Sequence, residues 1–451
     1  MIVIKYLLFF TLFFVLFTAS DPYFGPSSSV APEIKSDVKE RTWQHNHLRV
    51  YLHDKDNRVG EDFKIDQFYY PNVYFWFSIY TQYDSSSVVI HDRDDLSIVY
   101  KVLDFSSLRE KNLSKNTIFV LQNKLAEEKL KNLRGDFLEL EVNPFSLSPE
   151  AKRIYRMLKL SEVEIPVSRE ERIEFFKQRR LNLRSQTGQR NFIRDGVMRS
   201  LPYQNFLSKY FEDKKLPKEL LAIPFLESSF NPRAHSKANA LGVWQFMPLI
   251  ASYYVPKRTT EYDYRANVGI SSLSASFLLA ENIRILKSWD LAVTAYNSGT
   301  KHLLKTKRSL ASTNVNLEEI IKNSDSSHFG FASKNFYSEF LALAHTLAYR
   351  EEIFNDLHEH DRPDVDDELL FFMTKCGLKL NKILTPAELD DLLYHNHHIK
   401  KVQNNVPRGF LVTTKTTLSK KHFYQIEYKD LLKLKPKDWN KLLKNQSCST
   451  R

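Results

Sequence analysis

Helical periodicity over residues 216–349 constrains the fold of this chain more than any other feature of its sequence. Apolar residues recur there at three- and four-residue spacing, and few segments alternate in the way that strands do. Leu220, Ile223 and Leu226 belong to one such apolar stripe. We therefore expect a compact domain of packed helices over residues 211–355.

The N-terminal side combines a β-containing unit with basic helices. Residues 88–90 and 98–100 flank a turn-like stretch and predict a hairpin, and apolar residues also alternate over residues 73–80. These patterns predict a small β-containing unit over residues 40–110. Residues 111–210 show helical spacing with many Lys and Arg residues, which predicts a basic helical lead-in.

The C-terminal side is expected to hold a smaller unit. Residues 356–414 predict a small module with a helix over residues 366–372 and an extended segment over residues 409–413. The lysine-rich residues 415–451 are expected to form a loosely attached basic extension. The expected fold class is therefore α+β, with a mainly α domain between a small β-containing unit and a small C-terminal α/β module.

Residues 1–20 have the composition of a signal peptide. Lys5 precedes an apolar run over residues 6–17, which is shorter than the ~20 apolar residues of a membrane-spanning helix, and small residues follow. Removal of this segment would leave no stable membrane span. Residues 21–39 are rich in Pro and Ser and predict a flexible linker. We expect an exported protein.

The formal net charge of +11 suits a polyanionic partner. Nucleic acid, anionic lipid and the carboxylates of a bacterial wall all fit. For the basic residues over 169–210, a solvated helix face is the preferred interpretation and a contact with an anionic wall is the alternative. An exported chain without a base-stacking or groove-reading motif has little reason to bind nucleic acid. His395, His397 and His398 lie in a polar stretch without matching acidic or Cys ligands, so we expect solvated histidines, no metal and no other cofactor.

Glu227 is the strongest candidate for a catalytic residue. It follows the apolar stripe directly and precedes a predicted helix end, because Pro232 disfavours helix at Asn231. A carboxyl group beside Phe225 and Phe230 loses hydration, which favours its protonated form and suits a general acid at neutral pH. The alternative is an ordinary surface glutamate at the end of a helix.

Three later segments place polar side chains among apolar ones. Gln245 follows Trp244 within a bulky apolar stretch, and Tyr296 and Asn297 end an apolar helix. Tyr337 lies in a third segment with the same character. Each segment alone also fits ordinary core packing or a helix end, since apolar helices often end in Tyr-Asn-x-Gly.

Together, and in this order, the segments resemble the lysozyme-like lytic transglycosylases, in particular the membrane-bound lytic transglycosylase D branch. The matching motifs are Glu-Ser-x-Phe-Asn-Pro at 227–232, Gly-x-Trp-Gln-Phe-Met at 242–247, Ala-Tyr-Asn-x-Gly at 295–299 and Asn-Phe-Tyr at 335–337. The resemblance covers residues 183–349. It implies that the expected helical domain is a lysozyme-like catalytic domain.

The resemblance also implies a role for each matching side chain. Glu227 would be the catalytic acid/base, and Tyr337 would orient it. Ser228 would help to position the substrate, and Gln245 would contact the sugar near the cleaved bond. The substrate would also contact the remaining motif residues: Tyr296, Asn297 and Trp244. For Trp244, core packing is the preferred interpretation and a platform for a sugar ring is the alternative.

The implied activity is cleavage of peptidoglycan glycan strands in the bacterial periplasm or cell envelope. Glu227 alone would protonate the bond between N-acetylmuramic acid and N-acetylglucosamine and then deprotonate the C6 hydroxyl, which closes a 1,6-anhydro ring. A hydrolase would need a second carboxylate. None is evident among the acidic residues considered: Glu219, Glu261, Asp263, Glu281 and Asp290, of which Glu261 is the hardest to exclude. The alternatives are a lysozyme-type hydrolase and an inactive wall-binding protein, and the oligomeric state is left open.

Two stretches depart from the family pattern. Asn239 replaces the usual Gly of an Ala-Gly-Ala loop, and Asn tolerates left-handed backbone better than other non-Gly residues. Asn267 and Val268 replace the second acid and the proline of Asp-x-Arg-x-Asp-Pro, which puts the stiffness of that loop in question. In place of the family's lysin-motif repeats, residues 366–414 resemble at most one degenerate copy.

Overall fold

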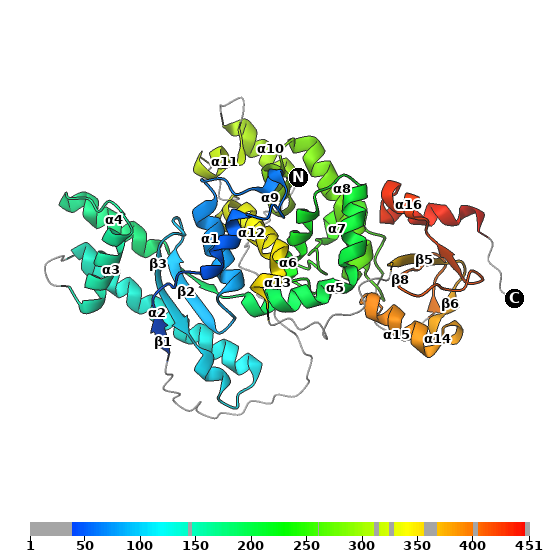
Figure 1. Ribbon diagram of the computed structural model, residues 1–451, viewed down its shortest axis with the longest axis horizontal. Helices are drawn as coiled ribbons and strands as arrows, with labels where there is room; N and C mark the ends of the chain where they lie inside the picture. The colour runs from blue at the N-terminus through cyan, green and yellow to red at the C-terminus, as the bar shows by residue number, and fades with distance from the viewer. Residues whose placement is uncertain are drawn as a thin grey trace, which may run out of the picture. The chain divides into compact units, whose positions relative to one another are not determined.

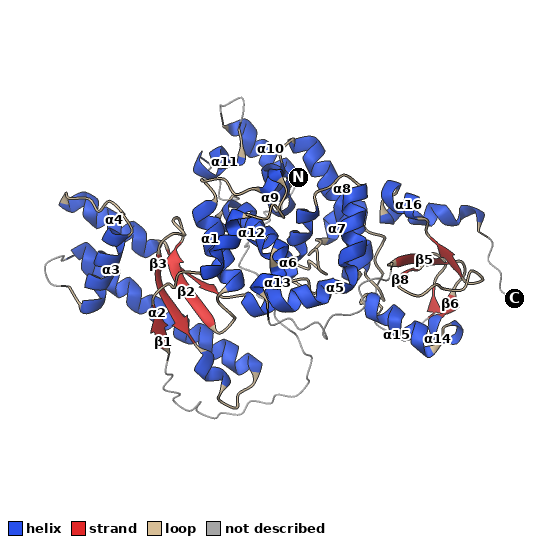
Figure 2. Ribbon diagram, viewed as in Figure 1, coloured by secondary structure: helices blue, strands red, loops and turns tan. Residues whose placement is uncertain are grey.

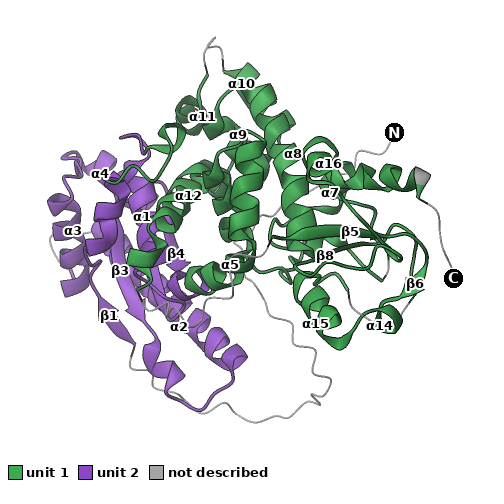
Figure 3. Cartoon of the chain, turned by 45° about the vertical axis from the view of Figure 1, so that its right-hand side comes forward, with its two compact units in different colours: residues 1–16, 56–64, 193–451 green, residues 17–55, 65–192 purple. Residues whose placement is uncertain are grey.

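The computed structural model describes residues 38–142, 147–259, 261–310, 315–323, 329–355, 368–399 and 405–446. The predicted signal peptide and all but the end of the predicted linker lie outside these residues. The chain divides into two compact units (Figure 3). We call Phe17–Lys55 with Ile65–Phe192 the sheet unit, and Asp56–Lys64 with Ile193–Arg451 the motif unit, because the latter holds the four motifs. In the described part of the chain, no helix has the length and apolar character that crossing a membrane requires.

The sheet unit is built on four antiparallel strands in the order β1-β3-β2-β4 (Figure 2). The predicted hairpin is confirmed, because β2 and β3 pair with Val89 opposite Val102. The strands are Lys39–Arg41 (β1), Ser87–Asp92 (β2), Val99–Asp104 (β3) and Leu183–Thr187 (β4).

Three helices cover one face of this sheet: Lys115–Val142 (α2), Pro149–Leu160 (α3) and Arg169–Leu181 (α4). Val88 and Ile90 of β2 share one buried cluster with apolar side chains of all three helices. These two residues are two positions apart, so their side chains point to the same face. The helical spacing that the sequence shows within residues 111–210 is confirmed for these three helices.

The predicted alternating strand over residues 73–80 is wrong, because this stretch belongs to the helix Tyr70–Thr81 (α1). Pro71 stands in the first turn, where a missing N–H costs nothing. Nearly every side chain from Val73 to Tyr80 is buried. A helix buried on every side gives an unbroken apolar run, from which neither a period of two nor one of 3.6 can be read.

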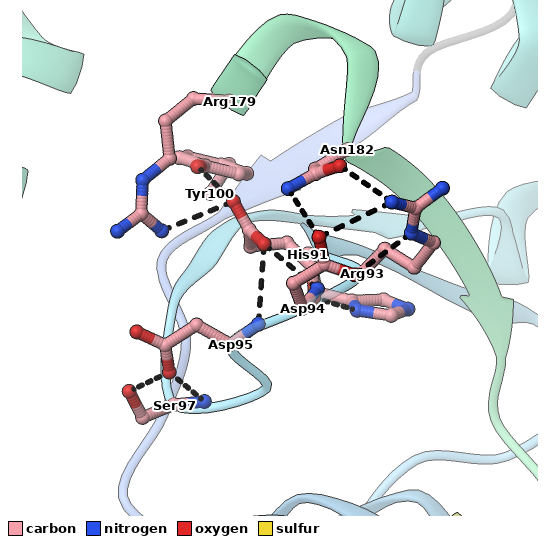
Figure 4. Close-up of polar contacts among 9 residues, drawn as sticks. His91, Arg93, Asp94, Asp95, Ser97, Tyr100, Arg179 and Asn182 are labelled. Carbon is pink, nitrogen blue, oxygen red and sulfur yellow. Dashed lines mark hydrogen bonds and ion pairs between the residues drawn. The ribbon is translucent and has the colours of Figure 1, made fainter. Parts of the chain in front are cut away.

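Asp92 organises the turn that follows β2 (Figure 4). Its carboxylate accepts hydrogen bonds from the backbone N–H groups of Asp94 (2.9 Å) and Asp95 (3.2 Å). It also accepts hydrogen bonds from the Tyr100 hydroxyl (3.2 Å) and from the Arg179 guanidinium (3.1 Å). Arg179 therefore neutralises a buried acid of the sheet.

The basic lead-in predicted over residues 111–210 is only partly helical. Strand β4 separates α4 from the helix Arg190–Asp213 (α5), so the sheet interrupts the basic stretch. Arg180 pairs with the buried Glu141 at 2.5 Å, as its neighbour Arg179 pairs with Asp92. Two of the expected surface charges thus stabilise the sheet unit internally.

In the described part of residues 211–355, where the sequence predicts a helical domain, every named element is a helix (Figure 1). The central helix, Val268–Leu286 (α8), packs against α7, α9 and α10. Ser271, Ser272, Ser274 and Ser276 of α8 are completely buried, and such small side chains let neighbouring helices approach closely. The other elements are Lys218–Ala222 (η4), Ile223–Ser228 (α6), Pro248–Tyr254 (α7), Tyr264–Ala266 (η5), Trp289–Ser298 (α9), Thr300–Ser309 (α10), Leu317–Asn323 (α11), Phe331–Ala348 (α12) and Arg350–Ile353 (α13).

The C-terminal module is an α/β unit around the sheet β8-β5-β9. Two of the predictions made for this module are wrong. Residues 370–372 are strand instead of helix, and the residues after 414 return to the sheet as β9 instead of forming a loose extension. Trp439 is fully buried and packs edge-on against Phe371, which fixes the end of the module.

The described elements of this module are two strands, two helices, three strands and two further helices, in chain order. They are Leu370–Thr374 (β5), Leu378–Lys379 (β6), Leu380–Ile383 (α14), Pro386–His395 (α15), Asn405–Val406 (β7), Leu411–Thr414 (β8), Phe423–Gln425 (β9), Tyr428–Lys433 (α16) and Pro436–Asn445 (η7). Between the antiparallel partners β5 and β8 lie α14 and α15.

Asn267 joins the C-terminal module to the helical domain. Its side-chain oxygen accepts a hydrogen bond from Ile270 N–H (2.8 Å) and caps α8, while its NH2 group donates to Asn396 (2.8 Å) and Thr413 (3.1 Å). All three polar residues of this contact are buried. An aspartate could form the cap but could not donate the two other bonds, so the departure from the family pattern at Asn267 has a structural reason.

The prediction of solvated histidines near residue 397 is wrong. His395 and His398 are almost fully buried beside this contact, and His395 lies 3.4 Å from Asp391. Burial lowers the pKa of His397 to about 4 and that of His398 to about 3, so both are neutral at pH 7. No group of three or more metal-ligating side chains exists among the described residues.

The Asn267 contact predicts the effect of an isosteric change. Asn267→Asp keeps the helix cap but removes the NH2 donor and leaves buried acceptors unpaired, so we expect a loss of about 1–3 kcal/mol in unfolding free energy, measured by urea denaturation. Asn316→Asp is the matched control, because Asn316 caps α11 at an exposed position. Equal stability of the two variants would contradict the role of Asn267.

Candidate active site

Glu227 lies near the C-terminal end of the short helix α6, where the backbone turns sharply. The next two residues after the helix, Ser229 and Phe230, have positive φ values of 50° and 56°. Ser229 N–H bonds to Phe225 O at 2.8 Å and Phe230 N–H to Pro224 O at 3.0 Å, which closes the helix. Non-glycine residues in the left-handed region cost free energy, and such strain is concentrated at functional sites.

Helix α5 holds this turn from outside. Arg199 donates to the carbonyl oxygens of Ser229 (2.6 Å) and Phe230 (3.3 Å). Gly196, one turn earlier, lies so close that a Cβ there would approach Ser229 O to 2.6 Å. The sequence marked Arg199 only as one of many basic residues; its contact with the Glu227 turn emerges from the packing of α5.

The carboxyl group of Glu227 is kept out of water, with 8% of the residue exposed. Burial is the main cause that raises its pKa to about 8, and the negative charge of Glu339 on α12 raises it further. Within the described residues, no cation pairs with this carboxyl group. At pH 7 Glu227 therefore carries a proton, which the sequence predicted for a general acid.

Tyr296 and Glu339 are the electrostatic neighbours of Glu227. Burial and then the charge of Glu227 raise the pKa of Tyr296 well above its ordinary value. The Tyr296 hydroxyl donates to the carbonyl oxygen of Trp244 at 2.6 Å. Glu339 was not among the acids considered from the sequence, because it lies 112 residues after Glu227 and only the packing of α12 on α6 brings them together.

Gln245 presents a free acceptor. Its backbone is left-handed, with φ 45°, and its NH2 group donates to the carbonyl oxygens of Ala234 (3.0 Å) and Gly242 (2.8 Å). These two bonds fix the orientation of the amide. Its Oε1 is buried and has no hydrogen-bond partner among the described residues. A buried acceptor without a partner is costly, and a hydroxyl or N–H group of a ligand would satisfy it.

Arg265 holds the loop that carries Gln245. Its buried guanidinium donates to the carbonyl oxygens of Asn239 and Phe246, both at 2.7 Å, and pairs with Asp263 at 2.8 Å. Asn239 has φ 69°, so it adopts the left-handed backbone that the sequence required of it in place of glycine. The loop is therefore stiff although the family's proline is missing.

Ser228 connects two of the motifs. Its hydroxyl lies 2.9 Å from Val243 O and 3.0 Å from Pro224 O, and it accepts a hydrogen bond from Asn231 N–H at 3.1 Å. With 3% of the residue exposed, the side chain is engaged inside the protein. Ser228 thus positions the Glu227 turn against the loop of Gln245.

Asn297 and Trp244 have different surroundings. Asn297 is half-buried on α9 and accepts a hydrogen bond from Ser333 of α12 at 3.1 Å. Trp244 is 0% exposed, donates its indole N–H to Ser272 at 2.8 Å and stacks on Phe211. A ring without exposed surface has no face for a sugar, so we assign Trp244 to the core and drop the platform alternative.

Tyr337 is buried on α12. Its ring stacks on Phe340, with 6.0 Å between centroids, and the charges that raise its pKa after burial are those of Asp290 and Asp62. The side chain of α12 whose charge acts on Glu227 is Glu339, two residues further along the helix.

The acids considered from the sequence have other partners. Glu219 accepts a hydrogen bond from Gly60 N–H (2.9 Å), Glu281 from the Tyr254 hydroxyl (2.7 Å) and Asp290 from Leu291 N–H (2.7 Å). Asp263 pairs with Arg265, as described above. Glu261 lines a separate pocket, together with residues of the C-terminal module.

Comparison with known proteins agrees with the motifs. Residues 206–317 match the family described as the transglycosylase SLT domain. The chain is 32% identical over 145 residues to membrane-bound lytic murein transglycosylase D of Escherichia coli (strain K12), which covers 32% of this chain and 31% of that protein. It is 36% identical over 112 residues to membrane-bound lytic murein transglycosylase E of Buchnera aphidicola subsp. Acyrthosiphon pisum (strain APS), which covers 22% of this chain and 49% of that protein.

The chain thus spans less than half the length of these two relatives. The family match includes Glu227, Gln245 and Tyr296 and ends before Glu339. These findings confirm the resemblance drawn from the four motifs: residues 206–317 of this chain match the transglycosylase SLT domain, and the chain is similar to the D branch of the lytic transglycosylases.

Proposed function

We propose that this protein is a lytic transglycosylase that cleaves peptidoglycan glycan strands in the bacterial periplasm or cell envelope. One observation carries the proposal: Glu227 is buried and protonated at neutral pH, in a motif that the SLT domain match includes. The names of both relatives, lytic murein transglycosylases, support the reaction class.

In the proposed mechanism, Glu227 serves twice. As an acid it protonates the oxygen of the bond between N-acetylmuramic acid and N-acetylglucosamine, and the bond from the muramic C1 to that oxygen breaks. As a base it then takes the proton of the C6 hydroxyl, whose oxygen bonds to C1. The product is a 1,6-anhydro ring, no water is consumed, and Glu227 returns to its protonated state.

Neighbouring side chains support this cycle. Gln245 Oε1 accepts a hydrogen bond from the sugar near the cleaved bond, because it is the buried acceptor left open. Tyr296 and Asn297 line the site from α9. Arg199 is a positioning residue, because it acts on the reaction only through the carbonyl groups that follow Glu227.

A lysozyme-type hydrolase is the second candidate, and Glu339 is the observation that favours it. Hydrolysis needs a second carboxylate as base or nucleophile. Glu339 is the described carboxylate whose charge acts on Glu227. We assign it an electrostatic role instead, because a fixed negative charge near the acid keeps Glu227 protonated. A catalytically inactive wall-binding protein, the third alternative, would have no need of a protonated, desolvated acid.

The first test replaces the acid. Glu227→Gln removes the proton donor, so we expect the release of soluble fragments from purified peptidoglycan to fall by at least about 100- to 10,000-fold. Mass spectrometry of the wild-type digest should show 1,6-anhydromuropeptides. Near-wild-type turnover by the variant would refute the assignment of Glu227, and reducing N-acetylmuramic acid ends as main product would establish a hydrolase.

The second test separates the two roles of Glu339. If the charge of Glu339 only keeps Glu227 protonated, Glu339→Gln retains activity. Because the substitution lowers the pKa of Glu227, the fall of kcat/KM that begins near pH 8 moves to lower pH. If Glu339 is instead the hydrolytic base, the variant loses activity at every pH. Glu212→Gln on the exposed face of α5 is the matched control and should leave the pH profile unchanged.

The third test concerns stability. The folded protein raises the pKa of Glu227 from an ordinary 4.5 to about 8, so between these values the folded state binds the proton more tightly. The contribution of Glu227 to unfolding free energy therefore falls as pH rises through this window. Glu227→Gln removes this pH-dependent loss of stability. We therefore expect the melting temperature of the variant to exceed that of the wild type by more at pH 8 than at pH 5. An equal gain at both values would contradict the burial of an uncompensated acid.

A further inference from the structure

A pocket lies where the helical domain meets the C-terminal module. It has a volume of about 450 Å3, and Thr259, Glu261 and Tyr262 form one wall. Gly377 and residues 405–407 of the module form the other wall. None of the motif residues around Glu227 lines it. The volume is in the range of pockets that hold small ligands.

Both walls of this junction pocket are held in place. On the domain side, Thr259 N–H bonds to Tyr262 O at 2.9 Å, and the Tyr262 ring packs edge-on against Phe410 of the module. On the module side, β7 pairs with β6, and the Thr374 hydroxyl donates to Pro407 O at 2.6 Å. A pocket whose walls are already ordered binds a ligand at a smaller entropic cost.

The buried contact of Asn267 with Asn396 and Thr413 fixes the two walls relative to each other. Tyr264 adds a second tie, because its hydroxyl accepts a hydrogen bond from Leu411 N–H at 3.1 Å. The module is therefore not tethered through a linker alone. Its side of the pocket keeps a set position against the helical domain.

Among the described residues, the lining of the pocket combines polar and apolar groups and holds no cation. Tyr262 offers an aromatic ring, and Val406 with Pro407 adds apolar surface. Glu261 and Asn405 offer hydrogen-bonding groups, and neither side chain has a hydrogen bond or ion pair within the described residues. An anionic ligand would meet the carboxylate of Glu261 and no compensating charge in the described lining.

We propose that this junction pocket binds an N-acetylated amino sugar of a glycan strand, as a subsite separate from the Glu227 site. A pyranose ring has apolar C–H faces and polar edges. The ring would lie on Tyr262, while Glu261 and Asn405 bond to its hydroxyl and acetamido N–H groups. The inference rests on the proposed function, because that function supplies the glycan strand.

Hydrogen exchange tests the subsite, with N-acetylglucosamine hexamer added to the full-length Glu227→Gln protein so that no cleavage occurs. We expect slower exchange at residues 259–262 and 405–407, in addition to residues 223–230. Tyr262→Ala in this background should lower the affinity measured at the pocket segments by about tenfold, as expected for the loss of one aromatic contact. Tyr253→Ala, at a tyrosine on α7 that is 53% exposed, is the matched control and should bind as the parent does.

Glu261→Gln provides a second variant, because Glu261 is exposed and the substitution changes no packing. We expect it to lower the affinity at the pocket about threefold or more. Protection at residues 223–230 without protection at the pocket segments would overturn the subsite and leave the proposed function intact. Protection at the pocket alone would support the subsite and count against the proposed function, and protection at neither would overturn the subsite. Protection at the pocket by a sugar-free stem peptide, and not by the hexamer, would overturn its assignment to a sugar.

Discussion

The removal of the Glu227 carboxyl group from water is the constraint on which the site depends. An ionised carboxylate in an apolar environment is costly, so burial shifts the group to its neutral form. The helix α6 ends one residue later, and the left-handed pair Ser229 and Phe230 turns the chain away. The site therefore stores free energy in two forms, a desolvated acid and a strained turn, and the surrounding helices must compensate for both.

Hydrogen bonds to backbone carbonyl groups offset the cost of the desolvated acid and of the strained turn. Arg199 of α5 holds those of Ser229 and Phe230, and Arg265 holds those of Asn239 and Phe246. Ser228 joins the two loops. Among the described residues, the carboxyl group of Glu227 and Oε1 of Gln245 remain available for hydrogen bonds. A ligand with hydroxyl and amide groups can form these bonds.

Hydrogen bonds from buried side chains also hold the C-terminal module. Asn267 caps α8 and at the same time donates to the module, so a loop of the helical domain becomes part of an interdomain contact. Neutral histidines are buried beside this contact, and Trp439 is buried against Phe371 within the module. The module thereby gains a fixed position beside residues 259–262, where the junction pocket lies.

Local patterns in the sequence determined the helices with one apolar face, the hairpin of β2 and β3, and the choice of Glu227 as the candidate acid, because each depends on neighbours within a few residues. The left-handed Asn239 also followed from its own chemistry. The sequence pattern gave a wrong prediction for α1, because burial on all sides removes the helical period of apolar residues. It also gave a wrong prediction for β5, because the strand is short. Only the tertiary structure decided that Glu339 acts on Glu227, that Arg199 supports the turn, that Trp244 is core and that the basic C-terminal end closes a sheet. The physical reason is that charge interactions, burial and strand pairing depend on distances in space, and helices such as α6 and α12 are brought together by packing that no local pattern records.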